Sequence, residues 1–304
     1  MERILITGAN GLLGQKIITL LANNPQVVLL ATSKSDSRIA LPYNASFQNL
    51  DVCDVAQVDQ VIEDWKPTAV IHTAAMTNVD ACETEQDLCY ALNVTATRSV
   101  AAASKKVGAY MVHISTDFIF DGESGPYAEG DFPNPLGYYG QTKWESEEAL
   151  STSGVAYSIL RTMILFGVEA NGKNNLVTWA KSALEKGDAI NVIDDQFRAP
   201  TLAENLAEAC INAIGKRAIG VYHVSGSTIL SIRDVVSEIA KFWNLDESHV
   251  TTVKTVDLGQ PAKRPPYTGF VLDRAIEELD FHPLSFRESL QVMDQQLKSK
   301  TRDK

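Results

Sequence analysis

Apolar residues in this chain gather into short continuous runs, and longer segments with a helical period separate these runs. Continuous rather than alternating hydrophobicity is typical of strands buried on both faces of a parallel sheet. The runs are RILITG, VVLLATS, AVIHTAA, AYMVHIST, YSILRTMIL and GVYHVSG. The helical patterns span residues 12–23, 55–64, 85–107, 141–152, 174–186, 203–215 and 231–243. This alternation predicts an α/β fold with a doubly wound parallel sheet.

The strand–helix alternation weakens after about Phe166, where loops become more frequent. We therefore expect two units along the chain. Residues 1–165 would form the sheet domain, and residues 166–304 would form mainly a smaller C-terminal lobe, with some strands and helices returning to the first domain.

The turn between the first strand and the first helix carries Gly8, Gly11 and Gly14, in the pattern GxxGxxG. Glycine permits unusual dihedrals and lets the backbone approach a pyrophosphate closely. The helix that follows offers free N–H groups and a favourable dipole to an anion. A plain tight turn is the alternative, but the position of the glycines after the first strand predicts a dinucleotide-binding domain of the Rossmann type.

The end of the second strand bears on which dinucleotide binds. An acidic residue there would bind the ribose 2′-hydroxyl of NAD. Here the sequence reads LLATSKSDSR, which places Ser33, Lys34 and Arg38 near the strand end. Hydroxyl and cationic groups suit a 2′-phosphate, so we expect NADPH. Asp36 keeps NADH as the alternative, and a solvated basic loop would favour neither cofactor.

A tyrosine and a lysine four positions apart, Tyr139 and Lys143, share one face of the predicted helix at 141–152 and the turn before it. The ammonium would lower the pKa of the phenol from its ordinary value of about 10, toward the range useful for proton transfer. Upstream, Ser115 and Thr116 end a central strand, where ligands bind in open α/β sheets. A solvated helix face and a capping Ser–Thr pair are the alternatives. The order of the three motifs favours catalysis.

Composition and charge narrow the classes of function. Of 304 residues, 45% are hydrophobic and 21% charged, and a net charge of −11 disfavours nucleic acid and anionic membranes as partners. Without a secretory pattern or an apolar run of about 20 residues, we expect a cytoplasmic protein. No spacing predicts a metal site, and three strand histidines are interpreted as core residues: His72, His113 and His223. The four scattered cysteines are expected to be reduced: Cys53, Cys82, Cys89 and Cys210.

The stretch STDFIFDGESGPYAEGDFPNPLGYYGQTKWESEE resembles the dTDP-4-dehydrorhamnose reductases, in the extended branch of the short-chain dehydrogenase/reductase superfamily. That family has an STDYVFDG-like strand end, a PYxE-like loop and a PLxxYGxxK run in this order. RTMILFG, DDQFRAPT and RPPYTGFVLD extend the resemblance over most of the chain. It implies NADPH-dependent reduction of the 4-keto group of a nucleotide-activated deoxysugar, and a homodimer is common in this branch.

The resemblance also implies roles for individual residues. Thr116 would orient the carbonyl, Tyr139 would give the proton, and Lys143 would lower the pKa of the phenol and hold the nicotinamide ribose. Together with the strand-end residues above, the positions expected at the cofactor are Gly8, Asn10, Gly11, Leu12, Leu13, Gly14, Ser33, Lys34, Asp51, Val52, Ala74, Ala75, Thr77, Asn93, Ser115, Tyr139, Lys143 and Thr162. Those expected at the substrate are Ser115, Asp117, Phe118, Asn174, Arg198 and Arg264, the two arginines as partners of the diphosphate.

Three positions depart from the family pattern on the substrate side. Arg198 replaces a usual glycine, Asn175 replaces an aromatic residue, and Leu165 stands where bulkier side chains are common. A cation in place of a glycine would reshape the pocket, so the sugar or nucleotide could differ from the usual one. The alternative for Arg198 is an ordinary surface cation in a loop.

Other kinds of protein share this scaffold, two of them enzymes and one a binding subunit. A dehydratase is expected to read Thr-Asp-Glu where this chain reads Thr116-Asp117-Phe118, and an epimerase would retain its NAD permanently. The regulatory subunit of methionine adenosyltransferase resembles the same reductases but acts by binding a partner. The intact Thr116, Tyr139 and Lys143 weigh against that role.

Overall fold

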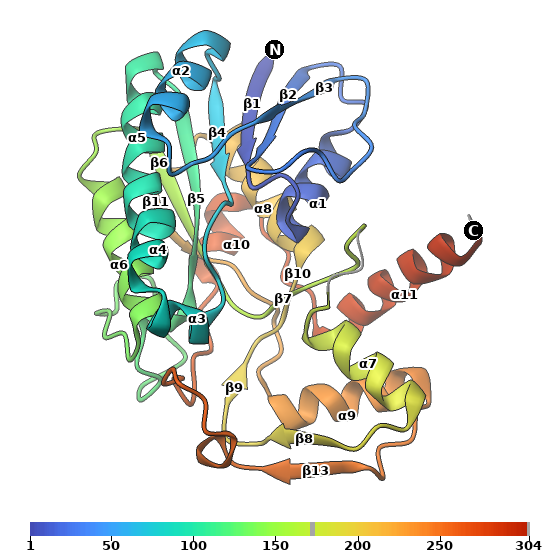
Figure 1. The fold of residues 1–304 in the computed structure, drawn as a ribbon. Coiled ribbons are helices and arrows are strands. Elements are labelled where there is room, and N and C mark those ends of the chain that lie inside the picture. The colour runs from blue at the N-terminus through green and yellow to red at the C-terminus, as the bar shows by residue number, and fades with distance from the viewer. Residues whose placement is uncertain (171–173, 303–304) are drawn as a thin grey trace.

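The computed structural model describes residues 1–170 and 174–302. Its centre is a sheet of seven parallel strands in the order β11-β6-β5-β4-β1-β2-β3 (Figure 1). The strands are β1 (Glu2–Thr7), β2 (Val27–Ser33), β3 (Ala45–Asn49), β4 (Ala69–His72), β5 (Tyr110–Thr116), β6 (Tyr157–Thr162) and β11 (Gly220–His223). The chain reverses its direction of winding beside β1, which is the point where ligands bind in such sheets. The predicted doubly wound fold is confirmed.

Helices cover both faces of the sheet (Figure 1). One face packs against α1 (Leu12–Leu21), α8 (Ala203–Lys216) and α10 (Asp273–Leu279). The other packs against α2 (Val55–Trp65), α5 (Ala96–Val107) and α6 (Tyr138–Ser151), while α3 (Val79–Thr84) and α4 (Gln86–Tyr90) lie beside the end of α6. The inner strands, such as β4 and β5, are buried on both faces, which explains their continuous apolar runs.

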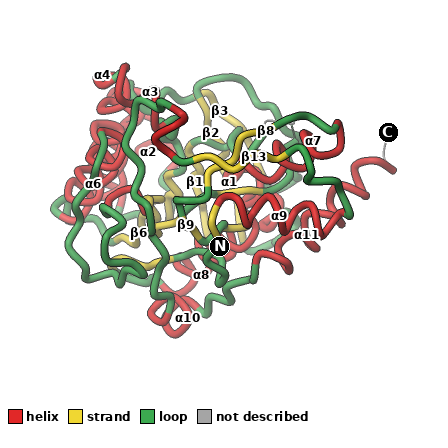
Figure 2. The backbone as a smooth tube through the Cα atoms, turned by 90° about the horizontal axis from the view of Figure 1, so that it is seen from below, coloured by secondary structure: helices red, strands yellow, loops and turns green. Residues whose placement is uncertain are grey.

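A second lobe has a separate hydrophobic core (Figure 1). Its helices are α7 (Leu176–Lys186), α9 (Ile232–Trp243) and α11 (Phe286–Arg302). Short strand pairs complete it: β7 (Leu165–Phe166) with β10 (Thr201–Leu202), β8 (Ile190–Ile193) with β13 (Val250–Val253), and β9 (Phe197–Arg198) with β12 (Leu230–Ser231). Seen from below, α6 and α7 lie on opposite sides of the molecule (Figure 2). In the part of the chain that the structure describes, no helix is long and apolar enough to cross a membrane.

The helix boundaries follow local chemistry. The side chain of Asp54 accepts a hydrogen bond from the backbone N–H of Gln57 at the start of α2. Ser231 and Asp234 form a reciprocal capping box at the start of α9, which ends at Asn244 in the left-handed conformation. Such caps satisfy backbone groups that a helix end leaves without partners.

Two predicted helices differ from those observed. One helix was predicted over residues 85–107. In the structure this segment consists of α4 and α5, joined by a π-helical turn at Ala91–Thr95. The helix predicted at 141–152 begins earlier, at Tyr138, because Gly137 is extended and ends the proline-rich loop. Tyr139 therefore lies in the first turn of α6, where the preceding loop determines its position.

Candidate active site

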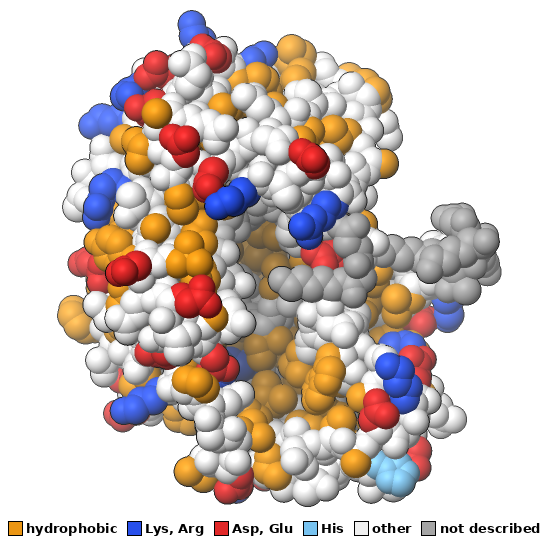
Figure 3. Space-filling view, viewed as in Figure 1, with side chains coloured by type: hydrophobic (Ala, Val, Ile, Leu, Met, Phe, Trp, Pro, Cys, Tyr) orange, Lys and Arg blue, Asp and Glu red, His pale blue; other side chains and the backbone are white. Residues whose placement is uncertain are grey.

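The front of the molecule is hollowed between the sheet domain and the second lobe, and hydrophobic side chains line the floor (Figure 3). A cavity of about 610 Å³ opens there. It runs from the glycine loop along the ends of β1, β4, β5 and β6 to the segment before α7. This one cavity is lined by the glycine loop, the strand-end hydroxyls and the Tyr–Lys pair. These residues are up to 135 positions apart in the chain (8 to 143).

The glycine loop is packed too tightly for side chains. A Cβ added to Gly14 would lie 2.7 Å from the Cα of Ala9, and one added to Gly8 would lie 2.8 Å from the backbone nitrogen of Ala74. Gly8 also has a φ of +70°, which glycine adopts without strain. Gly11 precedes α1 without a capping side chain, so the first N–H groups of this helix remain for a ligand. The cradle fits a dinucleotide pyrophosphate.

The other loop residues play different parts. Leu12 lines the cavity, as does Leu13, whose side chain is buried in the core against the sheet. The amide of Asn10 donates to the carbonyl of Asp36 (2.9 Å) and accepts from the N–H of Arg38 (2.9 Å). Asn10 therefore braces the loop after β2, where the second ribose of a dinucleotide is expected.

The charges at the end of β2 are partly paired. Lys34 Nζ lies 2.8 Å from the carboxylate of Asp51, which raises the pKa of Lys34 and lowers that of Asp51. Ser33 ends the strand, and Val52, next to Asp51, is buried. The carboxylate of Asp36, the residue that could favour NADH, accepts a hydrogen bond from Asn49 (2.9 Å). A cation thus remains at the place predicted for a 2′-phosphate, with an acidic neighbour.

On the flank of the cavity, Ala75 and Thr77 line the wall, whereas Ala74 packs against the core. Asn93 lies behind them in the π-helical turn, is 1% exposed, and does not line the cavity. Its amide accepts from the N–H of Met76 (2.8 Å) and donates to the hydroxyl of Thr142 on α6 (3.0 Å). Asn93 therefore fastens the flanking loop to the helix that carries the Tyr–Lys pair.

Two hydroxyls at the strand ends are buried without a hydrogen-bond partner in the protein. They are the Oγ of Ser115 on β5 and the Oγ1 of Thr162 on β6, and both residues line the cavity. Buried polar groups without partners are rare and costly. Two of them at the same end of the sheet fit the polar groups of a bound nicotinamide cofactor or substrate.

Thr116 and Tyr139 lie together at the end of β5. Thr116 accepts a hydrogen bond from the N–H of Phe118 (3.2 Å), and the ring of Phe118 meets that of Tyr139 edge-on, with centroids 5.6 Å apart. Burial raises the pKa of the Tyr139 phenol, and a hydrogen bond with Thr116 lowers it. Burial, not Lys143, dominates the pKa of Tyr139, which is therefore raised rather than lowered as expected.

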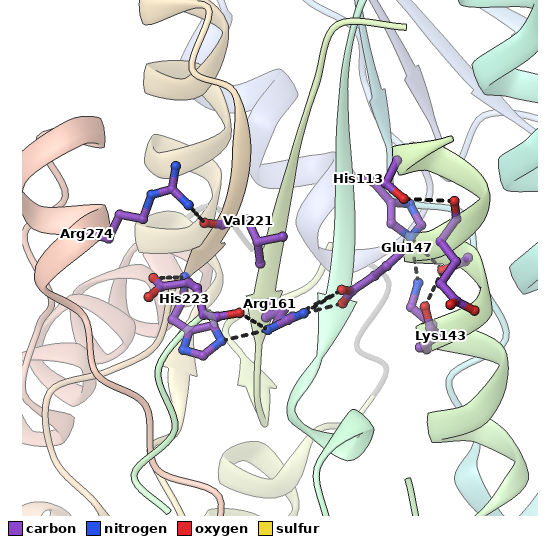
Figure 4. Close-up of polar contacts among 11 residues, drawn as sticks. His113, Lys143, Glu147, Arg161, Val221, His223 and Arg274 are labelled. Carbon is purple, nitrogen blue, oxygen red and sulfur yellow. Dashed lines mark hydrogen bonds and ion pairs between the residues drawn. The ribbon is translucent and has the colours of Figure 1, made fainter. Parts of the chain in front are cut away.

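Lys143 is buried and projects toward β5 (Figure 4). Its Nζ donates to the carbonyl of Ile114 (2.7 Å) and lies 3.3 Å from Nε2 of His113. Burial lowers the pKa of Lys143 to about 8, while Glu147, one helical turn further on, raises it. His113 is buried as predicted, and its contact with Lys143 is a feature that its apolar strand setting did not reveal.

A buried ionic network continues behind Lys143 (Figure 4). Glu147 accepts hydrogen bonds from Nε of Arg161 (3.0 Å and 3.2 Å) and from its Nη2 (2.7 Å), and Arg161 also contacts Nε2 of His223 (3.3 Å). Paired, hydrogen-bonded charges are those that a protein interior tolerates. The network fixes α6 against β6 and thus supports the position of Lys143.

The two arginines expected to meet a diphosphate are both engaged by the protein. Arg264 pairs with Asp80 at 2.7 Å. Arg198 is 2% exposed and pairs with Asp117 at 2.9 Å. The surface-cation alternative for Arg198 is therefore wrong, and neither arginine lines the cavity. Asp117 and Phe118 do line it, although the Asp117 carboxylate is buried.

The other substrate-side residues divide into lining and structural ones. Asn174 and Leu165 line the cavity. Asn175 lines it too, and its side chain caps α7 and donates to the carbonyl of Gly167 (2.7 Å), which accounts for a polar residue there. Sequence reasoning missed Ile164, a lining residue with a φ of +38° that is unusual for a β-branched side chain. The apolar run that contains Ile164 gives no sequence signal for this backbone conformation.

The described residues hold no cluster of three or more His, Cys, Asp or Glu side chains arranged as metal ligands.

The model of the RmlD substrate binding domain family matches residues 1–299. The chain belongs to this family.

Solved structures of this family extend the comparison. A dTDP-4-dehydrorhamnose reductase from Clostridium acetobutylicum is 34% identical, with a TM-score of 0.87 over 97% of this chain and 99% of that one. The Bacillus anthracis dTDP-4-dehydrorhamnose reductase, solved in complex with NADP, is 31% identical, with a TM-score of 0.85 and the same coverage. The resemblance read from the motifs is thereby confirmed at the level of family and fold.

A curated relative of different character is also similar. Methionine adenosyltransferase 2 subunit beta of Xenopus tropicalis is 31% identical over 265 residues, which cover 85% of this chain and 77% of that protein. Family membership therefore leaves the reaction to be argued from the site.

Proposed function

We propose that this protein catalyses the NADPH-dependent reduction of the 4-keto group of a nucleotide-activated deoxysugar. The observation that carries the proposal is the position of Thr116, Tyr139 and Lys143, which line the cavity that also contains the glycine loop. Reductases of the same family, one of them holding NADP, support both the reaction and the cofactor. The substrate class is inferred from these relatives, which are dTDP-4-dehydrorhamnose reductases.

Bound NADPH supplies the hydride that is added to C4 of the sugar. Tyr139 gives the proton to the carbonyl oxygen, and Thr116 turns its one hydroxyl proton from Asp117 to that oxygen and holds it in place. The raised pKa keeps the phenol protonated at neutral pH, as a proton donor must be. Lys143, with a pKa of about 8, is mainly an ammonium at neutral pH and stabilises the phenolate left behind.

The remaining contacts divide between the two ligands. Gly8, Gly11 and Gly14 would hold the pyrophosphate against α1, and Lys34 with Ser33 would meet the 2′-phosphate of NADPH. The unpaired hydroxyls of Ser115 and Thr162 would bind the nicotinamide or the sugar. NADH remains the alternative cofactor because Asp51 pairs with Lys34 and Asp36 adds a second carboxylate after β2.

The test is NADPH oxidation, followed by its absorbance, with a panel of nucleotide-linked 4-keto-6-deoxy sugars. Oxidation with at least one of them, abolished in Tyr139→Phe while NADPH still binds, would support the proposal. An epimerase would instead carry stoichiometric oxidised NAD through purification. A dehydratase would eliminate water from a 4-hydroxy sugar, and the absent glutamate after Asp117 argues against it.

The likeness to methionine adenosyltransferase 2 subunit beta supports a second candidate, a binding subunit without catalysis. Under this hypothesis the protein binds NADP but oxidises none of the panel. Co-purification with a methionine adenosyltransferase catalytic subunit would then be the positive observation.

A further inference from the structure

Arg198 lies in β9 of the second lobe, yet its guanidinium bonds to protein groups that include two other segments of the chain. Its Nε lies 2.9 Å from Oδ2 of Asp117, at the end of β5. Its Nη1 donates to the carbonyl of Phe197 (2.8 Å), and its Nη2 donates to that of Pro265. With these donors engaged and a side chain 2% exposed, Arg198 cannot also bind the diphosphate of a sugar nucleotide.

The partner of Arg198 is the residue that follows the catalytic threonine. Asp117 accepts a hydrogen bond from the hydroxyl of Thr116 at Oδ1 (3.1 Å) and from the hydroxyl of Thr268 at Oδ2. Its carboxylate is thus shared by the end of β5, by β9 and by the segment 265–268. Arg198 also lies over the ring of Phe118, 5.8 Å from its centroid, and Phe118 packs against Tyr139.

Backbone hydrogen bonds also join the segment 265–268 to β9. The N–H of Phe197 donates to the carbonyl of Pro266 (2.7 Å), and the N–H of Thr268 donates to that of Phe197 (3.3 Å). Arg198 adds the charged link from this segment to the catalytic strand. Three segments far apart in the sequence are therefore held together at one carboxylate.

We propose that Arg198 is a positioning residue: through Asp117 it holds the Thr116 hydroxyl in one rotamer beside Tyr139, and it fastens the second lobe to the catalytic strand before substrate binds. This inference rests on the proposed reductase function. It replaces a role for Arg198 in binding phosphate with a role in assembling the site.

The first test compares Arg198→Met with the wild-type protein in NADPH oxidation. We expect kcat to fall about 100-fold, as misplaced catalytic groups produce, with NADPH affinity unchanged because Arg198 does not line the cavity. Without its cation, the Asp117 carboxyl becomes harder to ionise, so the acid limb of the kcat profile should move to higher pH. Tyr139 and Thr268 face the same carboxyl, and Arg264 acts on Arg198, but none of them replaces the lost charge.

Two further variants separate charge from tethering. Arg198→Lys keeps a cation near Asp117 but lacks the planar fork for the carbonyls of 265–266, so it should restore the pH profile and leave kcat low. The double variant Arg198→Met with Asp117→Asn removes both charges and should show a low kcat without the shifted acid limb. Arg233→Met removes a half-exposed ion pair with Glu247 in the same lobe and should behave as wild type.

A readout without substrate keeps this inference distinct from the proposed function. Amide hydrogen exchange at Phe197 and Thr268 should be faster in Arg198→Met than in wild type or Arg233→Met. If wild type reduces no sugar but amide exchange is faster in Arg198→Met, the proposed reductase function is wrong and the positioning role of Arg198 is supported. Unchanged kcat, pH profile and exchange in Arg198→Met would overturn the inference, even with an active wild type.

Discussion

The two halves of the cavity are built in different ways. The cofactor half consists of regular elements with short connections: the Gly8–Gly14 turn, the ends of β1, β4 and β5, and the first turns of α6. The other half, which we propose holds the sugar and which is called the sugar half below, consists of short strands and loops, with Asp117 joined to Arg198 and Thr268 across 81 and 151 positions. The first half is therefore built from contacts within regular elements, and the second from contacts between segments that are distant in the sequence.

This difference explains where each half gains its precision. In the cofactor half, position comes from the sheet, whose strands are buried on both faces and keep a fixed register. In the sugar half, position comes from a buried ion pair and a few backbone hydrogen bonds. Substitution of Lys143 in the first half should therefore harm catalysis without loss of stability, whereas substitution of Arg198 in the second should harm both.

The largest expected effect is on turnover, in the cofactor half. Lys143→Met should lower kcat by about 1,000-fold, because the phenolate formed at Tyr139 loses its ammonium partner. In wild type, kcat should fall as pH rises through about 8, where Lys143 loses its proton. A pH series of initial rates measures both effects, with Lys241→Met on the surface of α9 as the control.

The same variant should not weaken the fold. The pKa of Lys143 is near 8 in the folded chain and 10.5 in its ordinary state, so burial of the ammonium costs stability below pH 8. Between these values the unfolded chain holds a proton that the folded one has lost, and wild-type stability should rise with pH. Lys143→Met should thus raise the free energy of unfolding at pH 7. A loss of stability on urea denaturation would contradict this account.

The next effect is on stability, in the sugar half. Arg198→Met should lower the free energy of unfolding by roughly 3 kcal/mol, because it leaves the carboxylate of Asp117 buried without its cation. The double variant with Asp117→Asn should recover part of this loss. Urea denaturation measures both. If Arg198→Met is as stable as Arg233→Met, the two halves do not differ as described.

The sequence predicted the cofactor half better because its motifs are local. Gly8, Thr116 and Lys143 each follow or begin an apolar strand or helix whose type the periodicity indicates. The end of a parallel strand then defines where the side chain lies. The strand β3 was missed because ASFQN, at the edge of the sheet, has little buried apolar surface.

The sugar half could not be predicted in the same way. Nothing in DDQFRAPT indicates that Arg198 turns inward to Asp117, because the pairing depends on how two distant loops meet. His113 is similar, since its strand predicts burial but not the lysine beside it. The direction of the Tyr139 pKa shift was also missed, because burial dominates it and a Tyr–Lys pair in the sequence does not reveal burial.

A smaller effect should follow from filling the glycine cradle. The added Cβ of Gly14→Ala would lie 2.7 Å from backbone atoms of the loop, so the loop must shift, at a cost of about 1–2 kcal/mol in stability. NADPH affinity should fall with it. Gly215→Ala in α8 is the matched control, since its Cβ meets nothing within 4 Å and should slightly stabilise the helix. Fluorescence titration and thermal unfolding distinguish the two variants.

The smallest effect concerns cofactor choice. Lys34 is 80% exposed and already paired with Asp51, so its contribution to binding a 2′-phosphate is screened by solvent. Lys34→Ala should weaken NADPH less than about tenfold and leave NADH unchanged, consistent with the modest energies of exposed ion pairs. Asp51→Asn should strengthen NADPH binding, because it frees Lys34 for the 2′-phosphate. Titration of each variant with both cofactors measures the ratio, and an equal loss for NADPH and NADH in Lys34→Ala would place the 2′-phosphate elsewhere.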